Sequence, residues 1–177
     1  MKGKIFIALI ILISLVLIIY TWLGGFQKAV IEKTTLSACT LMGKDYIGNA
    51  KSEKLGEIFV EIQNLKNEGK ISGTLAVIYF SIIGAKEDSV HAFVGIIVKD
   101  STTQVLPKDF IYKTLPSQQG LQARLNINSL VLTAEKIENT HLAINEFAQK
   151  EKIKLQPIAL EKYFSESEFV MEIPEKK

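Results

Sequence analysis

"ALEKYFSESEFVMEIP", residues 159–174, contains two short runs of alternating apolar and polar residues around a polar turn, which predicts a pair of β-strands. Period-two alternation places Ala159, Glu161 and Tyr163 on one face of the first strand. The carboxylate of Glu161 is the only charge on that face. It either faces water or stands in a groove where it contacts a ligand.

A similar strand occurs earlier in the chain. "LAVIYFS" at 75–81 and "ALEKYFS" at 159–165 end in the same tripeptide, Tyr-Phe-Ser, at a shift of 84 positions. On this register Tyr79 matches Tyr163, whereas Val77 matches Glu161. The two copies therefore differ by a carboxylate, as a single binding site at a pseudo-twofold groove would require.

The order of elements around the two strands also repeats. Apolar residues at helical spacing predict one helix after Ser52, ended by Gly69, and a second helix in the other half. The first stripe consists of Leu55, Ile58, Phe59, Ile62 and Leu65, and the second of Leu130, Ala134, Ile137, His141, Ile144 and Ala148. Strands are predicted over 29–42, 71–80, 90–98, 110–115 and 121–127. The first of them is expected to be bulged or broken, and an interruption follows it at 43–50. A loop is predicted around 84–88 and a connector at 99–108. The pattern is α+β: strand, helix, strand, strand, twice over.

The N-terminus has a different composition. Residues 5–23 carry no charge, and a helix of that length spans about 28 Å, close to the hydrocarbon thickness of a bilayer. A secretory signal peptide is the alternative, but the run ends in Tyr20, Trp22 and two glycines and has no small-residue cleavage site. We expect a transmembrane anchor at 1–25 and one domain at 26–177. The lysines before the span favour a cytoplasmic N-terminus and an external domain.

Charge, cysteine and histidine content argue against nucleic-acid binding, an internal disulfide and a metal site. The chain has 21 basic and 19 acidic residues; without Lys2 and Lys4 the two signs balance, and Arg124 is the only arginine, so nucleic-acid binding is not expected. Cys39, the only cysteine, cannot form an internal disulfide and is expected to be a small buried residue. His91 has no partner at metal-ligand spacing, and His141 is expected to be a packed histidine with one hydrogen bond. We expect no metal and no cofactor.

Several motifs resemble the GyrI-like, or bacterial effector-binding, SOUL-like family. "PIALEKYF" at 157–164 resembles its P-x-x-E-x-Y strand, "LAVIYF" at 75–80 resembles its first strand after a helix, and "EIP" at 172–174 resembles its closing strand. Gly43 and Tyr46 match a G-x-Y-like stretch. The resemblance implies two βαββ units that join into one antiparallel sheet and leave a groove between two helices.

The resemblance also implies a site. Glu161 would face the groove and contact cationic or polar groups of small aromatic ligands, with Tyr163, Tyr79 and Tyr46 as further binding residues. Two departures affect the rim of this groove: "YFSIIGAKED" at 79–88 lacks the family's turn proline, and the stretch from Pro116 to Leu121 has two extra residues and no aromatic.

One membrane helix before such a domain resembles small bacterial members and the animal receptor for selective ER autophagy. That receptor's interaction motif lies in a long acidic tail, which this sequence does not contain, so its role is not transferred. The expected contacts are a small molecule or a partner protein, and the bilayer through residues 5–23.

Three functions follow. The favoured one is binding of a small cationic or aromatic ligand in the groove. The second is a scaffold for protein interaction with a vestigial groove. The third is a hydrolase of small electrophiles, in which Glu161 acts as base beside Tyr163, about 7 Å away between Cα atoms. Binding is favoured over catalysis because one pair in one strand is the whole catalytic signal.

Overall fold

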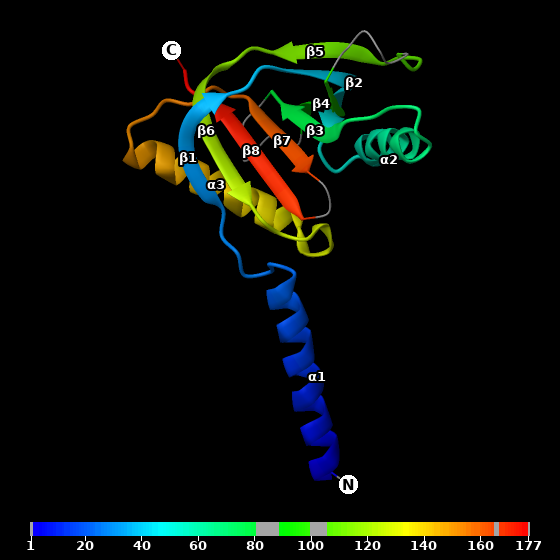
Figure 1. The fold of residues 1–177 in the computed structure, drawn as a ribbon, viewed down its shortest axis with the longest axis vertical. Coiled ribbons are helices and arrows are strands. Elements are labelled where there is room, and N and C mark those ends of the chain that lie inside the picture. The colour runs from blue at the N-terminus through cyan, green and yellow to red at the C-terminus, as the bar shows by residue number, and fades with distance from the viewer. Residues whose placement is uncertain (1, 81–88, 100–105, 165–166, 177) are drawn as a thin grey trace.

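The computed structural model describes residues 2–80, 89–99, 106–164 and 167–176. Within them the chain forms one antiparallel sheet in the order β1-β6-β8-β7-β3-β4-β2-β5 (Figure 1). The strands are β1 (Val30–Leu36), β2 (Cys39–Asn49), β3 (Thr74–Tyr79), β4 (Ser89–Val98), β5 (Ile111–Leu115), β6 (Gln118–Leu125), β7 (Ala159–Phe164) and β8 (Glu168–Pro174). The expected α+β class is confirmed. The loop predicted at 84–88 and most of the connector at 99–108 lie outside the described residues.

Two helices, α2 (Glu53–Asn67) and α3 (Ala134–Lys150), pack on the same face of the sheet. Each begins at a hydroxyl residue whose side chain accepts a hydrogen bond from a backbone N–H of the first turn: Ser52 before α2 and Thr133 before α3. Gly69, at φ 70°, follows the end of α2, where only a glycine adopts this conformation without strain.

The second apolar stripe begins later than the sequence indicates. Leu130 lies in a one-turn 3-10 helix, η1 (Ser129–Val131), and is 83% exposed, so its assignment to the stripe is wrong. The physical reason is the cap: Asn128 initiates η1 through its side chain, and Thr133 then begins α3 anew. Of the remaining members, Ile137, Ile144 and Ala148 pack against the sheet and His141 is buried. Ala134, the first residue of α3, is exposed, so its assignment to the stripe is wrong as well.

Each half of the sheet begins with a strand that pairs with the other half. β1 precedes β2 in the chain but pairs with β6, and β5 precedes β6 but pairs with β2. The predicted strand at 29–42 is therefore broken between β1 and β2. The interruption predicted at 43–50 is wrong, because β2 continues to Asn49. Gly43 faces Gly95 of β4, where a Cβ would collide with the Val94 backbone, so this glycine permits close strand approach instead of a turn.

The two halves meet at β3 and β7, which pair antiparallel at the centre of the sheet. Val77 pairs with Glu161, and Leu75 pairs with Tyr163. Because antiparallel strands run in opposite directions, residues 84 positions apart face each other only at Val77 and Glu161. The pseudo-twofold axis that relates the halves therefore passes between these two residues.

The remaining helix, α1 (Lys2–Trp22), extends away from the sheet (Figure 1). Its segment Lys4–Trp22 is long and apolar enough to cross a membrane, and none of it is buried against the domain. A signal sequence near the N-terminus can meet the same criteria of length and hydropathy.

Candidate ligand-binding site

Glu161 lies in the middle of β7, on the face of the sheet that carries α2 and α3. Its neighbours across the sheet are Val77 of β3 and Met171 of β8, both fully buried. Glu161 is itself only 1% exposed. The charge that interrupts the apolar alternation of β7 is therefore in the interior, at the pseudo-twofold axis.

The carboxylate of Glu161 is only half satisfied. The Tyr163 hydroxyl donates a hydrogen bond to Oε2 at 2.7 Å, whereas Oε1 has no partner among the residues that the structure describes. Burial raises the pKa of Glu161 to about 7, and the hydrogen bond from Tyr163 opposes that rise. The group is therefore a carboxyl that changes charge near neutral pH.

Two tyrosines adjoin this carboxyl group. Burial and the nearby Glu161 raise the pKa of both Tyr79 and Tyr163, so both hydroxyls stay protonated. The Tyr163 ring contacts both hydrophobic clusters on the helix-bearing face, and its centroid lies 5.3 Å from that of Phe169. Tyr163 thus contacts the cores of both halves, two residues along β7 from the axis.

A hollow of about 510 Å³ opens beside Tyr163, between the C-terminal end of α2 and the segment that leads into α3. Leu75 and Tyr163 of the central strands belong to its wall, but Glu161 does not, so Tyr163 separates the carboxylate from the hollow. The remaining lining residues are Gln63, Lys66, Asn67, Ile127, Ser129, Leu132 and Glu168. The hollow is thus mixed in character, with an apolar base and one charge of each sign.

The other predicted site residues lie apart from this hollow. Tyr46 stands in the same cross-strand row as Tyr79, separated from it by Ala92, and its hydroxyl donates to the Asn49 carbonyl at 2.8 Å. Its part in binding stays a prediction. His141 is buried as expected, but the predicted hydrogen bond is wrong, since neither ring nitrogen has a partner among the described residues. Burial lowers the pKa of His141, which keeps the ring neutral. No cluster of three metal-ligating side chains occurs in the described part of the chain.

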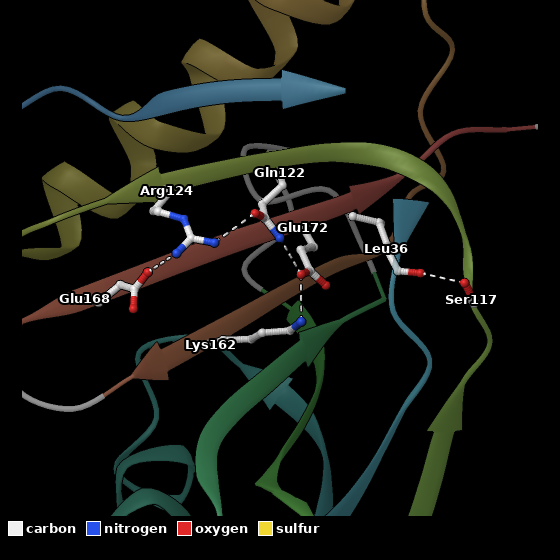
Figure 2. A network of polar contacts seen from close by, with 7 residues as sticks. All are labelled: Leu36, Ser117, Gln122, Arg124, Lys162, Glu168 and Glu172. Atoms are coloured by element: carbon white, nitrogen blue, oxygen red, sulfur yellow. Dashed lines mark hydrogen bonds and ion pairs between the residues drawn. The ribbon is translucent and has the colours of Figure 1, made fainter. Parts of the chain in front are cut away.

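Sequence reasoning missed a polar network on the opposite face of the sheet (Figure 2). Lys162 follows Glu161 and so points the other way, where its Nζ donates to Glu172 Oε1 at 2.6 Å. Gln122 donates to the same oxygen at 2.9 Å. Arg124 contacts Glu168 and donates to the Gln122 side chain, which extends the network across β6, β7 and β8. The alternation of β7 and β8 indicates this face, but not that Lys162 and Glu172 are buried in it.

The sequence matches no protein-family model and no curated protein. The fold matches solved structures. The C-terminal domain of EcmrR superposes with a TM-score of 0.60 at 10% identity, over 85% of this chain and 99% of that one. This chain spans 58% of the EcmrR chain in its complex with DNA.

Two further structures show the same likeness. SAV2435 bound to tetraphenylphosphonium has a TM-score of 0.52 at 11% identity, over 85% of this chain and 94% of that one. A hydrolase from Listeria innocua has a TM-score of 0.54 at 9% identity, over 84% and 93%. The chain therefore shares the overall fold of these three proteins.

Proposed function

We propose that this chain is a membrane-anchored binding protein that takes a small cationic, aromatic molecule into the hollow between α2 and the segment that leads into α3, with Glu161 as the counter-charge. The observation that carries the proposal is the buried, half-satisfied carboxyl group of Glu161 beside that hollow.

A carboxylate in this position destabilises the empty protein. Removing an ionised group from water without compensating hydrogen bonds costs several kcal/mol, and the raised pKa of Glu161 reports that cost. A cation placed near the free Oε1 would offset it. The position therefore suits a ligand that supplies a positive charge, and it suits a purely structural role poorly.

The aromatic part of the ligand would contact Tyr163. This ring lies between the hollow and Glu161, so a cation reaches the carboxylate only if the Tyr163 side chain turns away from Oε2. The ring face then becomes available to the ligand, and a cation–π contact contributes about 0.5–2 kcal/mol. Leu75 and Leu132 supply apolar surface next to it.

The structural neighbours agree with this class of ligand. SAV2435, which has the same fold, was solved with tetraphenylphosphonium bound, and that molecule is a cation surrounded by aromatic rings. We extend this chemistry to the present chain because Glu161 and the tyrosines offer complementary groups in this chain's own hollow.

The apolar helix α1 would hold the domain at a membrane. Its segment Lys4–Trp22 matches the hydrocarbon thickness, and Tyr20 and Trp22 stand at its end, where amphipathic aromatic side chains favour the headgroup level. With the N-terminus on the cytoplasmic side, the domain would sample compounds outside the cytoplasm.

Isothermal titration of residues 26–177 with tetraphenylphosphonium tests the proposal. We expect binding by the native sequence and loss of most of it in Glu161→Gln. Glu57→Gln is the matched control, because it removes the same charge from an exposed position of α2 outside the lining of the hollow, and it should bind as the native protein does. Equal affinity in all three proteins would contradict the assigned role of Glu161.

A hydrolase is a second candidate, favoured by one observation. A carboxyl group with a pKa of about 7 suits a general base, and the Tyr163 hydroxyl is within hydrogen-bond distance of it. One structural neighbour is described as a hydrolase. Hydrolysis of small electrophilic esters by residues 26–177 that persists in Glu161→Gln would eliminate this candidate.

A further inference from the structure

Backbone hydrogen bonds are formed both within the segment that follows α1 and between the end of α1 and the domain. The Asn128 backbone N–H donates to the Leu23 carbonyl at 3.0 Å, which ties the end of α1 to the loop before η1. Within the linker, Gly25 N–H donates to the Tyr20 carbonyl at 2.8 Å, and Gln27 N–H donates to the Gly24 carbonyl at 3.0 Å.

The two glycines explain how the linker fits so closely. Gly24 has φ 80°, and a Cβ there would stand 2.7 Å from the Asn126 carbonyl oxygen. A Cβ on Gly25 would collide with the Tyr20 ring, which also packs edge-on against Phe26 with centroids 4.9 Å apart. These close contacts restrict the conformation of the linker next to α1.

Large apolar side chains surround this junction and face outward. Trp22, Phe26 and Leu130 come from α1, the linker and η1, and they are 85%, 63% and 83% exposed. Leu130 is two residues from Asn128, whose backbone N–H donates to the Leu23 carbonyl. Two residues of chain span at most about 7 Å, so the Leu130 backbone lies within that distance of Asn128. The end of α1 and the linker that follows it lie at the end of the domain next to α1 (Figure 1).

Basic residues accompany these apolar ones. Lys28 and Lys136 line a hollow of about 460 Å³ between the linker and the first half of α3, together with Asn139 and Thr140. The acidic neighbour on the first turn of α3 is Glu135. The junction therefore combines exposed apolar groups with two ammonium groups and amide and hydroxyl groups, the combination that suits the interfacial layer of an anionic bilayer.

We propose that this junction face, formed by Trp22, Phe26, Leu130, Lys28 and Lys136, is a second membrane contact that seats the domain on the headgroup layer. The inference rests on the membrane anchor of the proposed function. The headgroup region adds about 5–8 Å beyond the hydrocarbon core on each side. With α1 spanning the core and ending at Trp22, Leu130 and Phe26 fall within that layer, and the lysines meet lipid phosphates.

This contact would fix how the ligand hollow faces the bilayer. Ile127 and Leu132, which flank η1, belong to the wall of the hollow beside Tyr163. The hollow therefore opens close to the membrane surface, within reach of amphiphilic cations that partition into the headgroup layer.

Fluorescence from the full chain in vesicles tests the contact. Because Cys39 is the only cysteine, Cys39→Ser gives a background in which Leu130→Cys carries an environment-sensitive fluorophore. Ile111→Cys on β5 is the matched control, since it is an exposed apolar residue at the end of the domain away from α1 (Figure 1). Vesicles contain phosphatidylcholine and phosphatidylglycerol, with or without a headgroup spin label.

We expect a blue shift and strong quenching by the spin label at position 130, and neither at position 111. The double change Lys28→Glu with Lys136→Glu should weaken the quenching at 130. Lys150→Glu with Lys154→Glu should leave it unchanged, because Lys150 is the last residue of α3 and Lys154 follows it, at the other end of the helix from Lys136.

Alkaline extraction of the same vesicles separates this proposal from the anchor. Retention of the chain together with an unquenched, water-exposed fluorophore at 130 would overturn the membrane contact and leave the anchor intact. Release of the chain would overturn both. Equal quenching at 130 and 111 would also overturn the contact, because it would show no preferred orientation.

Discussion

Replacing Glu161 by glutamine should change how the stability of the domain depends on pH. The pKa of Glu161 is raised from 4.5 to about 7 in the folded protein because the side chain is buried. The folded state therefore binds this proton more tightly than the unfolded chain does. Its free energy of unfolding falls as the pH rises from about 4.5 to about 7, and is level above that.

The size of the effect follows from the pKa difference. One pH unit between the folded and unfolded pKa corresponds to about 1.4 kcal/mol, so the rise from 4.5 to about 7 corresponds to roughly 3 kcal/mol. Glutamine cannot ionise, so the free energy of unfolding of Glu161→Gln should not fall in this way as the pH rises. Relative to the native sequence, Glu161→Gln should therefore gain about 3 kcal/mol of stability between pH 4 and pH 8, as an order of magnitude.

Urea unfolding of residues 26–177, followed by circular dichroism at several pH values, measures this difference. All eight described strands and both domain helices lie within that segment. Glu57→Gln, at an exposed position of α2, is the control and should show the same fall in stability between pH 4 and pH 8 as the native protein. Parallel profiles for Glu161→Gln and the native protein would refute the reasoning, because they would mean that Glu161 titrates in the folded state as it does in water.

Three further predictions concern the same residues and their neighbours. Affinity for a cationic ligand should weaken about tenfold from pH 8 to pH 6 in titration calorimetry, since a pKa of about 7 leaves far less carboxylate at pH 6; a flat profile would contradict this. Tyr163→Phe should lower the free energy of unfolding by about 1–3 kcal/mol in urea at pH 8, because Glu161 loses its hydrogen-bond donor. Glu172→Ala should cost about 3–5 kcal/mol by leaving Lys162 buried without its partner, whereas Lys162→Met with Glu172→Leu should be near neutral; similar losses in both would contradict the paired role.

The strand that carries Glu161 could be predicted because its side chains alternate and its tripeptide repeats. The shift of 84 residues identified Val77 as the counterpart of Glu161, and the structure pairs these two residues across the axis. Short stretches of sequence were sufficient to predict this strand, because both the alternation of side chains and the repeated tripeptide can be read from consecutive residues. The same holds for Gly69, whose place after α2 follows from the conformation that only glycine adopts easily.

Features that depend on distant partners could not be predicted in the same way. The exchange of β1 and β5 between the halves is set by pairing across the sheet, and no local pattern indicates it. Gly43 resembles a turn residue in sequence, but its role depends on Gly95, 52 positions away. Likewise, Leu130 lies in η1, whose N-cap residue Asn128 is hydrogen-bonded to the distant Leu23, so an apolar residue at helical spacing was wrongly assigned to the core.

The central claim is that Glu161 is the counter-charge of a ligand site, and its own titration tests this most directly. The carboxyl carbon of Glu161 can be followed by NMR in residues 26–177 labelled with ¹³C-glutamate and assigned with Glu161→Gln. We predict a midpoint near pH 7 without ligand, and a clearly lower midpoint at saturating tetraphenylphosphonium, because a bound cation favours the ionised form. A midpoint near 4.5 without ligand, or one that the bound cation leaves unchanged, would contradict the account.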